Sequence, residues 1–206
     1  MTRIGIFGGT FSPPHNGHIR GAKAFMEQMW LDLLYVIPTA QPPHKEMEEQ
    51  VSAAHRLRMA ELAFGGIEGV YVSDTEIRRG GKSYTVDTLR ELSGPDRRLF
   101  LFCGTDMMLT LDQWKDPEEI FKLCYPVYGR REKDHSLDQV IVDKIAEYNR
   151  KYGKVVRKIQ VDTLEISSHE IREKLSRGES AAGLIPPAVE QYIRENRLYG
   201  TGGMQP

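Results

Sequence analysis

The chain has 206 residues, of which 40% are hydrophobic and 28% charged, and its formal net charge is -1. Such a chain is long enough for one globular domain with a sizeable core. Its near-zero charge gives no overall basic field that would favour nucleic acid or a membrane surface. The N-terminus has no charged-then-apolar export pattern, and no apolar run approaches membrane-spanning length. We therefore expect a cytoplasmic protein without nucleic-acid or membrane partners.

Apolar runs and helical patterns alternate along the chain. Strands are expected at 3–7, 33–37, 70–72, 98–103, 125–128 and 158–161. Helices are expected at about 16–29, 52–64, 137–152 and 187–196, and others begin near 83–89, 116 and 166. Residues 78–82 are expected to form a basic, flexible turn. The alternation predicts an α/β fold, a Rossmann-like doubly wound parallel sheet, in a single domain over residues 1–200 with a disordered tail at 201–206.

The first predicted strand leads into a glycine-containing loop that runs from Gly8 to His18 and includes Pro13-Pro14. Its adjacent glycines let the backbone turn sharply and let a ligand approach closely. A strand, a glycine turn and a helix start together bind phosphate, because free N–H groups and the positive helix end face the anion. His15 and His18 share one face at helical spacing, so both can point at the same phosphate. The alternative is an ordinary strand-to-helix turn with surface histidines.

Other polar or glycine-containing segments follow later strands, at 39–45, 104–106 and 166–172. Ligands of a parallel sheet bind outside the carboxyl ends of its strands, so we expect these segments to lie along one edge. The two cysteines, Cys103 and Cys124, lie in strand-like surroundings and are expected to be buried structural thiols. No set of Cys, His and carboxylate residues has the spacing of a structural zinc site.

Five groups of residues occur in an order that resembles one enzyme family. They are Gly8-Gly9-Thr10-Phe11 with His15-Asn16-Gly17-His18, Pro42-Pro43-His44-Lys45, Tyr84-Thr85 with Asp87-Thr88-Leu89, Gly104 and Asp106 with Trp114, and Ile166-Ser167-Ser168 with Ile171-Arg172. The first group carries the H-x-G-H motif of a nucleotidyltransferase superfamily. The whole set spans nearly the full chain and resembles the bacterial nicotinate mononucleotide adenylyltransferases.

The resemblance implies a sheet of the nucleotidyltransferase type and transfer of the adenylyl group of ATP to nicotinate mononucleotide, giving deamido-NAD and pyrophosphate in NAD biosynthesis. In this reaction the substrate phosphate attacks the α-phosphorus in line. The nucleophile is already anionic, so catalysis reduces to alignment and stabilisation of developing charge. Mg²⁺ is expected to be carried by the ATP phosphates rather than by a protein metal site. The sequence leaves the oligomeric state open.

By the resemblance, His18 and His15 are the catalytic residues and contact the ATP phosphates. The other residues implied at the ATP site are Gly8, Gly9, Thr10, Phe11, Gly104, Asp106, Ile166, Ser167, Ser168 and Arg172. Simpler alternatives exist for some of them. Ser167 fits a helix capping box with Glu170, Asp106 fits a helix N-cap, and Arg172 fits an exposed helix surface. Capping and phosphate binding are compatible, because both use the same helix end.

The resemblance places nicotinate mononucleotide near Lys45, Tyr84, Thr85, Trp114 and Lys115, with Trp114 stacked on the nicotinate ring. A solvated surface charge is the alternative for Lys45, and a core position is the alternative for Trp114. Specificity for the acid over the amide is implied by the resemblance alone. A role for Arg130 and Arg131 in binding the mononucleotide phosphate stays open.

Two positions depart from the family pattern. Ser12 stands where the family usually has Asp, which leaves the anchoring of the loop open. His169 stands where the family usually has Thr after the paired serines, and it could add a polar group near the triphosphate.

Two other functions compete with the leading one. The first is another adenylyl- or cytidylyltransferase of the superfamily, with nicotinamide mononucleotide or phosphopantetheine as acceptor. The second is a non-catalytic nucleotide-binding module. The segments around Tyr84 and Trp114 argue against the first, and the intact His15 and His18 pair with Arg172 argues against the second.

Overall fold

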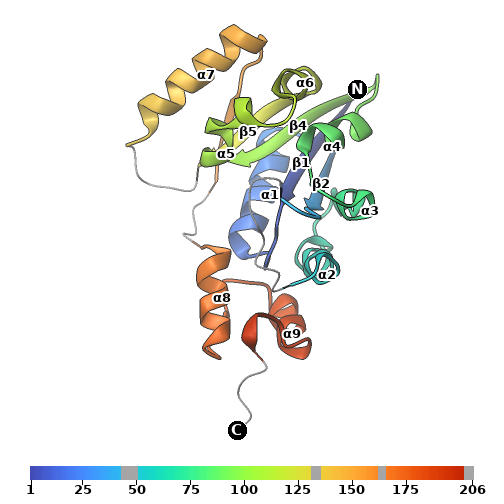
Figure 1. Cartoon of the computed structure of the whole chain (residues 1–206), viewed down its shortest axis with the longest axis vertical. Helices are drawn as coiled ribbons and strands as arrows, with labels where there is room; N and C mark the ends of the chain where they lie inside the picture. Colours follow the sequence, from blue (N-terminus) through green and yellow to red (C-terminus); the bar gives the residue numbers. More distant parts are fainter. Residues whose placement is uncertain (43–50, 131–135, 162–165, 202–206) are drawn as a thin grey trace. The chain divides into compact units, whose positions relative to one another are not determined.

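The structure, a computed structural model, describes residues 1–42, 51–130, 136–161 and 166–201 (Figure 1). Its strands are β1 (Thr2–Gly9), β2 (Leu33–Pro38), β3 (Val70–Val72), β4 (Arg97–Gly104), β5 (Cys124–Arg130) and β6 (Arg157–Gln160). They form one six-stranded sheet in the order β3-β2-β1-β4-β5-β6. β1 pairs in parallel with β4, β4 with β5, and β5 with β6. The expected α/β fold is confirmed.

The helices follow the predicted alternation except for two short ones, α3 (Thr75–Arg79) and α5 (Thr105–Leu109), which were not expected. They are α1 (Asn16–Gln28), α2 (Ala53–Phe64), α3 (Thr75–Arg79), α4 (Thr85–Leu92), α5 (Thr105–Leu109), α6 (Pro117–Leu123), α7 (Asp138–Tyr152), α8 (Ser168–Ser176) and α9 (Pro187–Glu195), with 3₁₀ turns η1 (Leu111–Gln113) and η2 (Leu198–Gly200). The turn expected at 78–82 is wrong in part, because Arg78 and Arg79 end α3. This helix is too short to produce an amphipathic repeat that periodicity could detect.

The described chain divides into two compact units, and the single domain expected over residues 1–200 stays a prediction. The first unit contains residues 1–8, 21–35 and 84–163. Phe102 of β4 lies at its centre, edge-on to Phe7 at 4.9 Å and stacked on Phe25 at 5.0 Å. Gly5 is required on β1, because a Cβ there would come within 2.5 Å of Leu31. The aromatic rings and the close strand packing together make a dense core.

Both cysteines lie in the first unit and are buried, as expected. The thiol of Cys103 donates to the carbonyl of Val127, and that of Cys124 donates to the carbonyl of Ile120. Burial raises the pKa of Cys103 to about 12 and also raises the pKa of Cys124. Both thiols are therefore uncharged structural groups.

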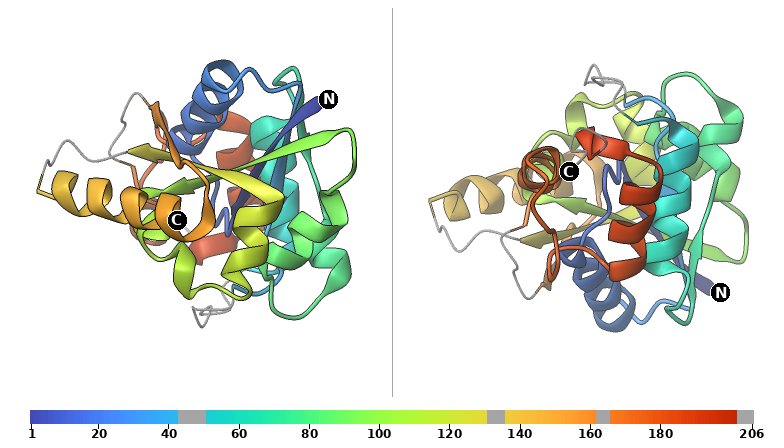
Figure 2. Two further views of the ribbon diagram at one scale, coloured as in Figure 1. Left: turned by 90° about the horizontal axis from the view of Figure 1, so that it is seen from above. Right: turned by 90° about the horizontal axis from the view of Figure 1, so that it is seen from below.

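The second unit contains residues 9–20, 36–83 and 164–206. Its core combines α2 with the C-terminal helices: α2 packs against α9, and η2 packs against α8 and α9 (Figure 2). The buried cluster is made of Val51, Met59, Ile166, Ile171, Leu175, Ala181, Ile185, Val189, Ile193, Leu198 and Tyr199. Across the residues that the structure describes, no helix has both the length and the apolar character needed to cross a membrane.

Candidate active site

The imidazole rings of His15 and His18 stack at the start of α1, with centroids 3.6 Å apart and planes inclined by 23°. The backbone N–H of His15 donates to Nδ1 of His18 at 3.2 Å, and the N–H of His18 donates to Nδ1 of His15 at 3.3 Å. A ring nitrogen that accepts a hydrogen bond carries no hydrogen, so each neutral ring has its hydrogen on Nε2. The local backbone thus fixes both histidines as Nε2–H donors.

The loop before these histidines is held in place by side chains that donate hydrogen bonds to its carbonyl groups. Nη1 of Arg172 donates to the carbonyl of Ser12 at 2.9 Å, and the Ser168 hydroxyl donates to the carbonyl of Pro13 at 3.0 Å. Both donors come from α8, so the second unit brings two predicted phosphate ligands onto the predicted phosphate loop. Arg172 is half-buried, with its guanidinium hydrogen-bonded to the loop, rather than fully exposed on the helix surface.

Phe11 gives the loop its shape. Its backbone φ is 48°, in the left-handed region, and its side chain is only 2% exposed. The ring packs edge-on against His18 at 5.1 Å and against Phe64 at 5.7 Å. A Cβ on Gly9 would lie 3.1 Å from this ring, so glycine gives the ring room over the backbone. Phe11 is therefore a core residue that supports His18.

Arg56 on α2 was not singled out by the sequence analysis, yet its side chain is fully buried beneath the same loop. It donates from Nη1 to the carbonyl of Thr10 at 3.0 Å and from Nη2 to the carbonyl of Ala40 at 3.1 Å. Among the described residues, its Nε finds no hydrogen-bond partner. Burial lowers the pKa of Arg56. The residue joins the glycine loop to the segment that follows β2.

A signal for Arg56 was present in the sequence. It lies three, four and eight residues before Met59, Ala60 and Phe64, which are the buried positions of α2. Helical spacing therefore places Arg56 on the buried face. A buried arginine is rare unless it is paired or hydrogen-bonded, which marks it as a residue with a specific task.

α8 begins with the predicted capping box. The Ser167 hydroxyl accepts from the N–H of Glu170 at 3.1 Å, and the Glu170 carboxylate accepts from the N–H of Ser167 at 3.2 Å. Ile166 is 8% exposed and belongs to the core, so its side chain fixes the entry to the helix. His169 is exposed and lies 3.4 Å from the Glu173 carboxylate on the outer face of α8.

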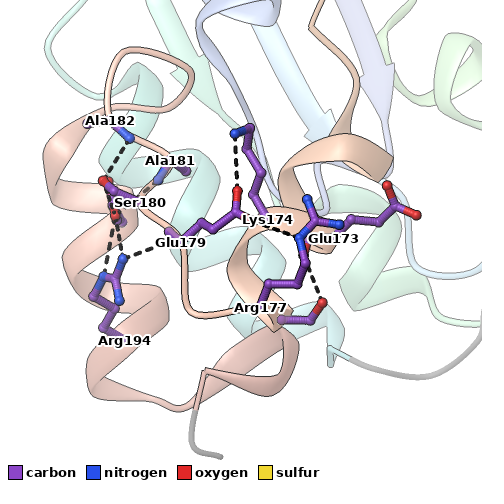
Figure 3. A network of polar contacts seen from close by, with 10 residues as sticks. Glu173, Lys174, Arg177, Glu179, Ser180, Ala181, Ala182 and Arg194 are labelled. Atoms are coloured by element: carbon purple, nitrogen blue, oxygen red, sulfur yellow. Dashed lines mark hydrogen bonds and ion pairs between the residues drawn. The ribbon is translucent and has the colours of Figure 1, made fainter. Parts of the chain in front are cut away.

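The start of α1 is tied to the loop between α8 and α9. Asn16 donates through its backbone N–H to the carbonyl of Leu184 at 2.8 Å and through its amide to the carbonyl of Gly183 at 2.9 Å. Preceding residues of that loop are fixed by polar contacts (Figure 3). Ser180 donates to Glu190 at 3.1 Å, and Arg194 donates to the same carboxylate at 2.8 Å. The H-x-G-H motif therefore rests on an ordered support.

Two glycines that are predicted at the ATP site lie in the first unit, at the ends of the neighbouring strands β1 and β4. Gly8 lies at the end of β1, and Gly104 ends β4 and precedes α5. Among the described residues, a Cβ on either glycine would meet no heavy atom within 4 Å, so the space over both is open. Asp106 is exposed in the first turn of α5, and Gly104 rather than Asp106 is the N-cap residue.

Lys115, one of the predicted mononucleotide residues of the same unit, belongs to a chain of charged residues with Asp87, Arg90 and Asp116. Nζ of Lys115 lies 4.4 Å from the ring centroid of Tyr84 and 3.2 Å from the Asp87 carboxylate. Arg90 bridges Asp87 at 3.2 Å and Asp116 at 3.1 Å. Asp116 therefore uses its carboxylate on Arg90 instead of capping α6, although the helix begins at Pro117 as expected. The structure thus brings Tyr84 and Lys115 into direct contact, and Lys115 also pairs with Asp87.

Trp114 is half-buried and ends η1, so it is not one of the fully buried core residues. Thr85 opens α4, one residue after Tyr84. η1 is braced by α7, because Asp112 accepts from Lys144 at 2.7 Å and from the Tyr148 hydroxyl at 3.0 Å. Burial alone would raise the pKa of Asp112, but these two hydrogen bonds outweigh it and hold that pKa below its usual value.

Some predicted residues are not placed. Lys45 and Arg131 lie outside the described residues, as does the tail after residue 201, and the side chain of Arg130 is likewise not described. Within the described ranges, no three His, Cys, Asp or Glu side chains are grouped closely enough to hold a metal ion.

Known proteins resemble the chain over nearly its whole length. The family model described as cytidylyltransferase-like matches residues 6–174. A protein of Geobacter sp. (strain M21) named "Probable nicotinate-nucleotide adenylyltransferase" is 41% identical over 211 residues, covering 96% of this chain and 98% of its own length. A protein of the same name from Desulfatibacillum aliphaticivorans is 37% identical over 214 residues, covering 96% and 99%.

A solved structure shares the fold. It is titled "Plasmodium falciparum nicotinic acid mononucleotide adenylyltransferase complexed with NaAD" and superposes with a TM-score of 0.76 at 20% identity, covering 97% of this chain and 98% of that one. A second structure of the Plasmodium falciparum protein, complexed with APC, has a TM-score of 0.73.

Proposed function

The chain belongs to the cytidylyltransferase-like family and, within it, to the bacterial nicotinate-nucleotide adenylyltransferases, and we propose on this premise that it transfers the adenylyl group of ATP to nicotinate mononucleotide. The products are deamido-NAD and pyrophosphate. The structural observation that carries the proposal is the pair of stacked histidines, which the backbone holds as two Nε2–H donors at a helix start. Such donors suit a phosphate whose negative charge grows in the transition state.

The reaction is a direct displacement at the α-phosphorus. A phosphate oxygen of nicotinate mononucleotide forms the new P–O bond, and the bond from the α-phosphorus to its bridging oxygen breaks, so that pyrophosphate leaves with the electron pair. The attacking oxygen is already anionic, and no proton has to be removed. The chain's task is to align the two phosphates and to stabilise the charge that develops on them.

The donor residues have distinct proposed roles. His18 and His15 donate from Nε2 to ATP phosphate oxygens, with His18 nearest the reacting phosphate. Arg172 and Ser168 serve the β- and γ-phosphates from α8, whose N-terminal end also favours anions. Their contacts with the carbonyls of Ser12 and Pro13 support this role, because they place both side chains on the phosphate loop. Asp106 in the first turn of α5 accepts from ribose hydroxyls.

The acceptor residues are proposed from the first unit. Trp114 stacks on the nicotinate ring, with Tyr84 and Thr85 beside it, and Lys115 contributes positive charge. The preference for the acid over the amide belongs to this proposal and rests on the relationship with the named relatives. Lys45 is proposed as a further ligand of the mononucleotide.

Mg²⁺ is proposed to be carried by the ATP phosphates. This ion prefers oxygen ligands, keeps several waters and is held in nucleotide sites largely by the substrate's phosphates. The described groups at the glycine loop are Nε2–H and guanidinium donors, which suit phosphate oxygens rather than the ion itself. The ion would neutralise charge on the pyrophosphate that leaves.

Acceptor preference tests the proposal. Pyrophosphate release from ATP and Mg²⁺ is measured with nicotinate mononucleotide, nicotinamide mononucleotide and phosphopantetheine supplied separately. The proposal predicts the highest kcat/KM with the nicotinate compound. A higher kcat/KM with phosphopantetheine would assign the chain to another activity of the superfamily, and ATP binding without release for any acceptor would favour a non-catalytic nucleotide-binding module.

A further inference from the structure

One side chain from the C-terminal end reaches the phosphate loop. The hydroxyl of Tyr199 lies 2.9 Å from the hydroxyl of Ser12, and the two residues are 187 positions apart in the sequence. Both belong to the second unit. Ser12 also offers its carbonyl to Arg172 at 2.9 Å. The residue is therefore fixed on its side-chain side by Tyr199 and on its backbone side by Arg172.

Tyr199 is itself held firmly. It is 5% exposed and packs in the core cluster with Ile171, Leu175 and Ile193. The next turn is closed by Thr201, whose hydroxyl donates to the carbonyl of Leu198 at 2.9 Å. A ring fixed in this way offers its hydroxyl in one direction, so little conformational entropy is lost when the hydrogen bond forms.

The backbone on both sides of this hydrogen bond adopts an uncommon conformation. Tyr199 has φ 56° and Phe11, directly before Ser12, has φ 48°, so both lie in the left-handed region. Arg197 is also left-handed, with φ 53°. Non-glycine residues pay a free-energy cost there and remain only where the surroundings over-determine them, which is common at ligand-binding segments. The backbone conformations of both segments therefore fit the hydrogen bond between Ser12 and Tyr199.

The chemistry of the pair suits a neutral hydrogen bond. Burial raises the pKa of Tyr199 to about 12, so the phenol keeps its proton throughout the physiological range. The hydrogen bond to Ser12 and the nearby guanidinium groups of Arg172 and Arg56 lower the pKa of Tyr199 but do not cancel the effect of burial. The tyrosine hydroxyl can therefore donate to Ser12 at any pH at which the enzyme would work.

We propose that Tyr199 is a positioning residue for the phosphate loop, which it holds through Ser12 so that the loop presents His15 and His18 to ATP in one fixed orientation. The inference rests on the proposed adenylyl transfer and extends it to the C-terminal segment. It also accounts for the anchoring of the loop where Ser12 departs from the family pattern. Tyr199 touches neither reacting phosphate in this role, because it acts through the loop.

Three variants test the proposal: Tyr199→Phe, Ser12→Ala and the double variant. Each single change removes the same hydrogen bond, so we expect each to lower kcat about 3- to 10-fold, the range for one such bond. The double variant should lose no more than the larger of the two single losses, because only one interaction exists to be removed. A double loss equal to the product of the single losses would overturn the proposal.

Tyr192→Phe is the matched control. Tyr192 lies in the same unit, and its hydroxyl is 2.8 Å from Nδ1 of His55. Like the contact of Tyr199 with Ser12, this contact ties a C-terminal element, here α9, to an earlier part of the chain, here α2. We expect this variant to lose thermal stability like Tyr199→Phe but to keep the kcat of the parent chain. An equal fall of kcat in Tyr192→Phe would show that Tyr199 acts only through general stability, and a kcat of Tyr199→Phe within about twofold of the parent would also contradict the proposal.

ATP affinity separates this inference from the proposed function. The dissociation constant of ATP with Mg²⁺ is measured by calorimetry for the parent and all variants, without an acceptor. If the parent releases no pyrophosphate with nicotinate mononucleotide, the proposed function fails, yet the positioning role still predicts about 3- to 10-fold weaker ATP binding in Tyr199→Phe and Ser12→Ala. Unchanged ATP affinity and unchanged kcat in those variants would overturn the positioning role itself.

Discussion

His15 and His18 fix each other's tautomer, because the backbone N–H of each residue donates to Nδ1 of the other at 3.2 and 3.3 Å. The consequence is that both rings carry hydrogen on Nε2. The two reciprocal hydrogen bonds are built into four consecutive residues, whereas the orientation of the loop that carries them depends on contacts with other parts of the second unit. A short motif thereby produces two hydrogen-bond donors of known direction.

This geometry predicts different behaviour for two amides at position 18. The amide nitrogen of glutamine can reach the place of Nε2, whereas that of asparagine can reach only the place of Nδ1. A hydrogen bond to a charged oxygen contributes about 1.5–3 kcal/mol, so His18→Gln should retain roughly 10- to 150-fold more kcat than His18→Asn. Steady-state pyrophosphate release measures both. Equal activity of the two variants would mean that Nε2 is not the donor.

A second prediction concerns the buried guanidinium of Arg56, which holds the carbonyls of Thr10 and Ala40. Lysine keeps the charge but cannot donate along two fixed directions. Arg56→Lys should lower the free energy of unfolding by about 1–3 kcal/mol, because it leaves a buried acceptor without a partner. Arg58→Lys is the control, since Arg58 pairs with Glu61 on the exposed face of the same helix. Urea midpoints that fall equally in both variants would contradict the role of Arg56.

Local features of the chain could be predicted from the sequence better than its tertiary contacts. The glycine loop and the capping box at Ser167 are local patterns, and they form as expected. The contact of Arg172 with Ser12 joins residues 160 positions apart and depends on tertiary packing. Tyr199 gave no local signal at all, because it follows the last predicted helix and occupies a left-handed turn that favours other residue types.

The burial of Arg56 on α2 shows that assigning a residue to the surface by its type alone can be wrong. Arg56 is fully buried on this helix, beside Met59 and Ala60. An arginine is normally assigned to solvent. Here the two carbonyls that it satisfies belong to the glycine loop and to the segment after β2, and no local pattern shows where such carbonyls will point.

Trp114 provides a third prediction, which concerns the acceptor alone. If its ring stacks on nicotinate, Trp114→Ala should raise the KM for nicotinate mononucleotide about 3- to 10-fold, given roughly 0.5–1.5 kcal/mol for an aromatic pair. The KM for ATP should not change. Trp30→Ala is the control, because Trp30 is 78% exposed and follows α1 in the same unit. A rise in the KM for ATP alone would show that Trp114 does not belong to the acceptor site.

The fourth prediction is a pH dependence of stability. Burial raises the pKa of Tyr199 to about 12 in the folded chain from an ordinary value of 10. The stability linked to the protonated phenol is fully present below pH 10 and is lost as the pH rises from 10 towards 12. Tyr199→Phe lacks this loss, so its difference from the parent in unfolding free energy should shrink between about pH 9 and about pH 11.

Urea unfolding of both proteins at the two pH values measures this effect. Tyr148 also has a raised pKa, because burial and its bond to Asp112 both act on it, but it is present in both proteins and cancels in the comparison. A constant difference between parent and Tyr199→Phe over this range would show that the phenol of Tyr199 is not buried as described.

The central claim is that the α-phosphorus of ATP moves to nicotinate mononucleotide in one displacement. The most direct measurement follows two labels, with ATP carrying ³²P at the α position in one reaction and at the γ position in another. The account predicts that the α label appears in deamido-NAD and the γ label in pyrophosphate, in equal amounts and only when nicotinate mononucleotide is present. Label from the γ position in the dinucleotide or in a phosphorylated acceptor, or α label that stays in AMP or ADP, would contradict it.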